Sequence, residues 1–241
     1  MNIIQMWLRA TSLLQRYYNR IKIALFESRG VIFVFHEVDT ANRHGVESSC
    51  FCFVDTFRQL LVQYKGQFCS LDEFLTNDEG KKVVITFDDV PESIYTHAYP
   101  LLCEQQVPFV LYLSPKFIDK EGFLSVNQIK EMAKNQLCTI GAHTMKHTKL
   151  RMEIDSYDDI YQSKVEVETI VGKTVEHLAY PYGRADSVSR KVRNEARNAG
   201  FKSATCTIPT EVPKRFDRWY MPRVTVINEF TSVFQNENSN S

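Results

Sequence analysis

An alternation of short apolar runs with helical patterns, between residues 31 and 227, constrains the fold of this chain most. The apolar runs are rich in β-branched and aromatic residues and lie at 31–35, 83–87, 109–113, 138–140, 177–180, 202–206 and 224–227. Helical patterns separate most of them, at 55–66, 91–105, 125–135, 156–172 and 187–199. About seven strands that alternate with helices predict an α/β protein with a mostly parallel sheet, either a (β/α) barrel or a doubly wound sheet.

Helix-end signals support this division. Ser125 has the position of a helix N-cap, and Gly66, Gly172 and Gly200 each end a helical pattern. Ser156 stands three residues before Asp159, the spacing of a capping box with Asp in place of Glu. We therefore expect Ser156 to cap the helix that ends at Gly172.

The chain of 241 residues shows no repeats and no internal linker, so we expect a single folded domain over residues 30–230. Residues 1–29 are predicted to form an amphipathic helix and residues 231–241 a polar tail. In residues 1–26, apolar residues at helical spacing alternate with basic ones, without the unbroken apolar run of a signal peptide or a membrane span. This helix is expected either to pack on the domain or to lie on a membrane surface.

Charge and cysteine content exclude some functions. Lys plus Arg and Asp plus Glu both number 29, so no basic excess indicates nucleic-acid binding. Neither a GxGxxG nor a GxxxxGK[ST] motif is present to bind nucleotide phosphates. The six cysteines include no CxxC pair and are expected to be reduced thiols. We therefore predict a cytoplasmic protein, with residues 1–26 as its contact to the inner face of the membrane.

Polar residues follow several predicted strands, at the carboxyl ends where parallel α/β folds place their sites. His36 follows the strand at 31–35, Asp88 and Asp89 follow the strand at 83–87, and His143 and His147 follow the strand at 138–140. The tripeptide Pro181, Tyr182 and Gly183 follows the strand at 177–180. Because these ends meet at one edge of the sheet, the residues are expected to converge.

Two imidazoles and one carboxylate are a ligand set that suits Zn²⁺ or a similar divalent ion. The second aspartate would then act as a base beside the metal. Taken singly, each pattern has a simpler explanation. The histidines could cap a loop, and the aspartates could cap the following helix.

The segments "TFDDV", "HTMKH" and "YPYG" occur in this order and resemble the motifs of the NodB-type polysaccharide deacetylases, carbohydrate esterase family 4. The resemblance covers about residues 30–227 and implies a distorted (β/α)7 barrel. It assigns Asp88 as the general base and Asp89, His143 and His147 as ligands of Zn²⁺, or of another divalent metal such as Co²⁺, Ni²⁺ or Fe²⁺. Pro181, Tyr182 and Gly183 would bind substrate, with the Tyr182 N–H facing the oxyanion.

The chain departs from this family pattern at three places. Val90 replaces the usual Gly, Ala179 replaces the usual Arg, and no histidine follows His177 to form the late LxH motif. Circularly permuted members, the poly-N-acetylglucosamine deacetylases, carry the acid histidine on an N-terminal strand and the Arg in a late "PR" pair. By this resemblance His36 is the general acid and Arg223 orients Asp88, while Trp219 or Tyr220 lines the substrate pocket.

The resemblance implies a metal-dependent hydrolase that removes acetyl from an N-acetylated sugar of a polysaccharide, an oligosaccharide or its precursor, in surface-polysaccharide synthesis. One alternative is a C–N hydrolase of a small non-sugar amide. Another is a non-catalytic carbohydrate-binding relative, since a fold does not by itself fix a function.

Overall fold

The computed structural model describes residues 27–42 and 50–226. Most of the expected N-terminal helix, including residues 1–26, and the polar tail at 231–241 lie outside these residues. The first strand, β1, begins at Ser28, two residues before the expected start of the domain. Among the residues that the structure describes, no helix is long and apolar enough to cross a membrane.

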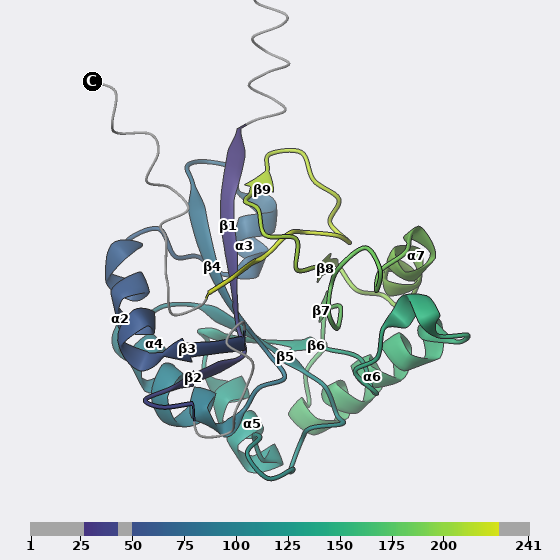
Figure 1. Ribbon diagram of the computed structural model, residues 1–241, viewed down its shortest axis with the longest axis horizontal. Coiled ribbons are helices and arrows are strands. Elements are labelled where there is room, and N and C mark those ends of the chain that lie inside the picture. Colours follow the sequence, from purple (N-terminus) through teal and green to yellow (C-terminus); the bar gives the residue numbers. More distant parts are fainter. Residues whose placement is uncertain (1–26, 43–49, 227–241) are drawn as a thin grey trace, which may run out of the picture.

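A curled sheet forms the centre of the domain, with its strands in the order β10-β1-β4-β5-β6-β7-β8 and all neighbours parallel (Figure 1). These strands are β1 (Ser28–Phe35), β4 (Lys82–Asp88), β5 (Phe109–Leu113), β6 (Cys138–Ala142), β7 (His177–Ala179), β8 (Ser203–Thr205) and β10 (Val224–Thr225). A short strand, β9 (Val212–Pro213), adds to β1 in the antiparallel direction. Strands β1, β4 and β5 are buried on both faces along most of their length, which explains why their sequences are unbroken apolar runs.

The last segment of the domain joins the two ends of this sheet. Met221 donates its N–H to Ala204 of β8, and Cys206 donates to Met221. A few residues later, Val224 pairs with Phe33 of β1. The described chain therefore forms the predicted distorted (β/α)7 barrel, and this closure brings β10 beside the first strand.

Helices cover the outside of the sheet, with α2 and α4 on one side and α6 and α7 on the other (Figure 1). Their bounds are α2 (Val54–Gln63), α3 (Leu71–Thr76), α4 (Tyr99–Glu104), α5 (Val126–Lys134), α6 (Ser156–Val171) and α7 (Arg190–Asn198). A π-helical segment, Ile94–Ala98, runs into α4, and a 3-10 turn, Leu150–Met152, precedes α6. Helix α2 packs Phe57 against Phe35 of β1, with ring centroids 5.0 Å apart.

The start of α6 differs from the prediction. Its N-cap is Asp155, whose carboxylate accepts the Asp158 N–H at 3.1 Å, and not Ser156. The Ser156 hydroxyl instead donates to Glu195 of α7 at 2.5 Å. Either residue type can cap a helix. The tertiary contact with α7 decided between them.

Two further short strands carry too little pattern for a sequence-based prediction. Strand β2 (Glu37–Asp39) follows His36 directly and pairs in parallel with β3 (Phe51–Phe53). This two-stranded sheet therefore begins just beyond the carboxyl end of β1. All six cysteines are free thiols, as predicted.

Candidate functional site

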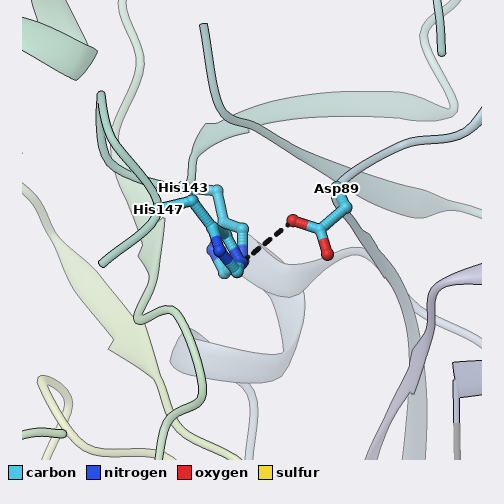
Figure 2. A group of neighbouring side chains, drawn as sticks. All are labelled: Asp89, His143 and His147. Atoms are coloured by element: carbon cyan, nitrogen blue, oxygen red, sulfur yellow. Dashed lines mark ion pairs between the residues drawn. The ribbon is translucent and has the colours of Figure 1, made fainter. Parts of the chain in front are cut away.

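Asp89, His143 and His147 converge at the carboxyl ends of β4 and β6 (Figure 2). The Nε2 atom of His147 lies 3.1 Å from Asp89 Oδ1, and that of His143 lies 3.6 Å from the same oxygen. Their ligand atoms all lie within 4.8 Å of one another. The structure thus brings together the three residues that the sequence predicted as metal ligands.

His143 is held in one orientation by the neighbouring strand. Its Nδ1 lies 2.8 Å from the carbonyl oxygen of Ala179, and its backbone N–H donates to Leu113 at 2.7 Å. Because a carbonyl only accepts, Nδ1 must carry the proton, which leaves the Nε2 lone pair of the neutral ring facing Asp89. Burial lowers the pKa of His143 against the opposing effect of Asp88 and Asp89, which favours this neutral form.

The cluster fits a divalent cation. Asp89 Oδ1 is buried and accepts no hydrogen bond from the described residues. Two imidazole nitrogens and this oxygen form a donor set that Zn²⁺ and similar ions prefer, with coordination positions left for water or substrate. Burial would raise the pKa of Asp89, but the adjacent His147 and the other neighbouring histidines outweigh burial and lower this pKa, so the carboxylate form is favoured.

The backbone around the cluster is strained. Asp89, Val90, Thr144, His147 and Tyr182 all have positive φ angles, of 56°, 47°, 62°, 52° and 62°. Such conformations cost non-glycine residues free energy and concentrate at functional sites. Val90, where the family pattern has Gly, keeps a left-handed conformation despite its branched side chain, which is buried. The departure at residue 90 therefore retains a turn of the kind that favours glycine.

Arg223 forms a bidentate ion pair with Asp88. Its Nη1 and Nη2 donate to the two carboxylate oxygens at 2.7 and 2.6 Å, and both side chains are buried. The guanidinium also donates to the Thr86 hydroxyl and to the carbonyl of Cys206. Burial by itself would raise the pKa of Asp88, but the Arg223 charge reverses this and lowers the pKa, so Asp88 is ionised.

Ala179, which stands where the family pattern has Arg, carries no group that could bind Asp88. The late segment containing Arg223 supplies the cation instead, as the sequence predicted for the permuted variant. Arg223 can do so because β10 pairs with β1, next to the β4 strand that ends in Asp88.

His36 joins the same group from the end of β1. Phe35 pairs with Phe87 in the register of β1 and β4, so His36 follows β1 at the level where β4 ends in Asp88. Its Nδ1 atom is buried and has no hydrogen-bond partner among the described residues. An imidazole beside an ionised carboxylate can hold or deliver a proton. His36 thus stands at the end of β1, beside the strand that carries both aspartates, and its role as the general acid stays a prediction.

Pro181, Tyr182 and Gly183 form a turn beside His147. The Tyr182 ring is half exposed and lies 5.2 Å from the His147 ring, between centroids. The Tyr182 N–H donates to no acceptor among the described residues, which leaves it available to a substrate oxygen. At Gly183, φ is 63° and an added Cβ would meet Thr207 N at 2.5 Å. The tight turn therefore requires glycine.

The structure does not bring Trp219 together with these residues. Its indole N–H donates to the Phe201 carbonyl at 3.1 Å, and Arg197 lies over its ring. Phe201 precedes β8, so this contact lies toward the start of the strand, whereas the metal cluster lies beyond the strand ends. The Tyr220 ring likewise lies under Arg193 of α7.

Two positioning contacts gave no sequence signal. The Asp159 carboxylate accepts the N–H of Lys146 at 3.0 Å, and its backbone carbonyl accepts that of Met145 at 3.3 Å. Helix α6 therefore holds the loop between His143 and His147 at its middle. On another side, the Phe117 ring lies 5.3 Å from the His147 ring, between centroids. Both contacts join segments whose meeting depends on tertiary structure.

Comparison with known proteins places this geometry in a family. The family model described as "Polysaccharide deacetylase" matches residues 76–204, more than half of the chain. The chain is similar to the poly-beta-1,6-N-acetyl-D-glucosamine N-deacetylase of Staphylococcus aureus strain MSSA476, at 25% identity over 241 residues, which cover 92% of this chain and 81% of that protein.

Solved structures show the same fold. A polysaccharide deacetylase from Bacillus cereus has a TM-score of 0.73 at 24% identity, over 83% of this chain and 66% of that one. The Streptococcus pyogenes deacetylase PplD, solved in complex with acetate, has a TM-score of 0.74 at 20% identity, over 83% of this chain and 93% of that one.

Proposed function

The chain belongs to the polysaccharide deacetylase family, and on this premise we propose that it is a metal-dependent N-deacetylase of an N-acetylglucosamine polysaccharide. The observation that carries the proposal is the placement of Asp88, fixed by Arg223, next to the group of Asp89, His143 and His147. The named activity of the Staphylococcus aureus relative supports N-acetylglucosamine as the sugar.

Asp89, His143 and His147 would hold the divalent ion. Such an ion, when bound, lowers the pKa of water toward neutrality and polarises a carbonyl oxygen. We assign the removal of the water proton to Asp88, which is ionised and whose two oxygens Arg223 fixes.

His36 is assigned the opposite proton transfer. The leaving amine of an acetamide must gain a proton before the C–N bond breaks, so a general acid is required. His36 follows β1 beside the strand that ends in Asp88, and among the described residues no other histidine outside the metal group directly follows the carboxyl end of a strand. The Tyr182 N–H, which has no acceptor within residues 27–42 and 50–226, is assigned to the oxygen that becomes negative.

Acetate release from an N-acetylglucosamine oligomer by the purified full chain tests the proposal. Chelation should abolish release, and Zn²⁺ or Co²⁺ should restore it. Activity that persists in protein shown by elemental analysis to contain no divalent metal would overturn the metal requirement. Faster hydrolysis of small non-sugar amides would favour the C–N hydrolase alternative, and tight oligomer binding without acetate release would favour the binding relative.

We also propose, from the sequence alone, that the protein acts in the cytoplasm and contacts the inner membrane face through residues 1–26. It would then modify a sugar precursor during surface-polysaccharide synthesis. Cell fractionation that recovers a processed form from the periplasm would refute this location.

A further inference from the structure

An exposed apolar stripe runs along α6, outside the site described above. Tyr157, Tyr161 and Val165 are 38%, 40% and 39% exposed and stand four residues apart. Residues at this spacing lie above one another on one face of a helix. Met152 and Ile154, which are 77% and 99% exposed, precede them in the segment that leads into α6. We take these neighbouring exposed apolar residues as a candidate interaction surface.

The two tyrosines of the α6 stripe have a defined arrangement. Their rings are parallel to within 7°, with centroids 5.8 Å apart. A tyrosine ring offers an apolar face and a polar edge, and it attracts a cation placed over that face. A pyranose ring has a matching character, because C–H groups cover its faces and hydroxyl groups surround its edge.

Unpaired acidic residues lie beside the stripe. Asp158 and Glu166 each follow a stripe residue, and Glu153 and Asp155 lie in the preceding segment. Each of these four carboxylates lacks an ion pair with any described residue, whereas Lys164 of the same helix is neutralised by Glu168. Arg151, which precedes Met152, is also exposed, and its guanidinium donates only to the Ala185 carbonyl among the described residues, but the four carboxylates outnumber it. The surface is therefore net negative and complementary to a positively charged partner.

The start of α6 lies beside the loop of the metal cluster. The buried Asp159 accepts the Lys146 N–H in the middle of the loop that joins His143 and His147. Tyr157 stands two residues before Asp159, so the stripe lies on the outer face of the same helix. Lys149, two residues after His147, bridges to Asp186 at 2.8 Å, close to the Tyr182 turn. Helix α6 lies on the outside of the sheet, beside α7 (Figure 1).

We propose that the α6 stripe binds the part of the polymer that has already been deacetylated. This inference rests on the proposed function. Hydrolysis converts a neutral acetamide and water into an amine and acetic acid, and the amine then takes up a proton. The product chain therefore gains positive charges that the substrate lacks. The tyrosines stack on its sugar rings, and Asp158 and Glu166 attract its ammonium groups.

Binding of a glucosamine oligomer, measured by calorimetry on the full chain, tests this inference without turnover. We expect Tyr157→Ala with Tyr161→Ala to weaken the dissociation constant by about tenfold, from the loss of two cation–π contacts. Asp158→Asn with Glu166→Gln should weaken it and reduce its salt dependence. Tyr95→Ala, which removes one ring of the stacked Tyr95–Tyr99 pair elsewhere on the surface, should leave it unchanged.

Unchanged affinity in both double variants would overturn the inference, as would an equal loss in Tyr95→Ala. So would equally tight binding of an N-acetylated oligomer of the same length by the metal-free protein. A dimer that the tyrosine variant abolishes in light scattering would assign the surface to a second copy. Flotation with phosphatidylglycerol vesicles that the same variant abolishes would assign it to a membrane.

Acetate release tests the proposed function separately from the α6 proposal. The tyrosine variant should release acetate from a short N-acetylglucosamine substrate at the wild-type rate, because the stripe lies outside the metal site. If the wild-type protein binds the glucosamine oligomer but releases no acetate, and the double variants lose this binding, the α6 proposal is supported and the catalytic proposal is wrong.

Discussion

Arg223 holds both carboxylate oxygens of Asp88, at 2.7 and 2.6 Å, although 135 residues separate the two in the chain. A planar guanidinium is the side chain that can form this two-point contact. The contact fixes the rotation of the carboxylate and keeps it ionised inside the protein. It also ties the closing segment of the barrel to the strand that carries the site.

Removal of this cation should alter both stability and pH dependence. Arg223→Met leaves a buried carboxylate unpaired, which costs about 3–5 kcal/mol of unfolding free energy. The main effect that opposes burial at Asp88 is then lost, so the pKa of Asp88 rises and less of the base is ionised in acid. The acidic limb of the kcat/KM profile should therefore move to higher pH.

Arg223→Lys is the matched comparison, since it keeps the charge and loses the bidentate geometry. Its acidic limb should lie between those of the wild type and Arg223→Met, while its kcat falls. A folded Arg223→Met protein whose acidic limb stays in place would contradict the role of the cation.

His36→Ala should remove the general acid and leave the metal ligands intact. The expected loss in kcat is about 10²–10⁴, with bound metal unchanged by elemental analysis. His97→Ala serves as the histidine control, because His97 pairs with Asp39 at 3.3 Å and not with the two site aspartates. Near-normal turnover of an N-acetyl sugar by His36→Ala would show that the acid lies elsewhere.

Asp159→Ala should weaken metal binding although Asp159 is not a ligand. Its carboxylate holds the Lys146 N–H, so its loss frees the loop between the two histidines. Asp159→Asn keeps an oxygen acceptor and should restore affinity. Zinc affinity, measured by competition with a chelator, checks both variants.

Asp155→Ala controls for damage to α6 itself. It removes the N-cap, which should cost about 1 kcal/mol of stability, without contact to the histidine loop. If Asp155→Ala lowers zinc affinity as much as Asp159→Ala does, the effect belongs to the helix and not to the loop contact.

Val90→Gly should lower the free energy of unfolding less than the matched substitution Val107→Gly does. Both Val90 and Val107 are buried outside helices and strands, and glycine removes about 1.5–3 kcal/mol of apolar burial at each. Only Val90 has positive φ, so glycine there also relieves strain of about 1–2 kcal/mol. Urea unfolding of Val90→Gly and Val107→Gly measures the difference, and equal losses would argue against strain at Val90.

The sequence by itself determined the alternating strands and helices, because apolar periodicity and turn residues act over short distances. It also determined which residues stand at the strand ends, and so the grouping of Asp89, His143 and His147. The resemblance to permuted deacetylases extended this to Arg223, whose contact with Asp88 the structure shows.

Only the tertiary structure decided contacts between segments distant in the chain. The capping of α6 by Asp155 depends on Glu195 engaging Ser156, and the role of Asp159 depends on α6 lying against the histidine loop. The position of Trp219 depends on its segment pairing with β8. Such contacts form only when the whole chain packs. The free energy of a helix cap or a loop conformation then depends on residues far away in the sequence, which a local sequence pattern does not include.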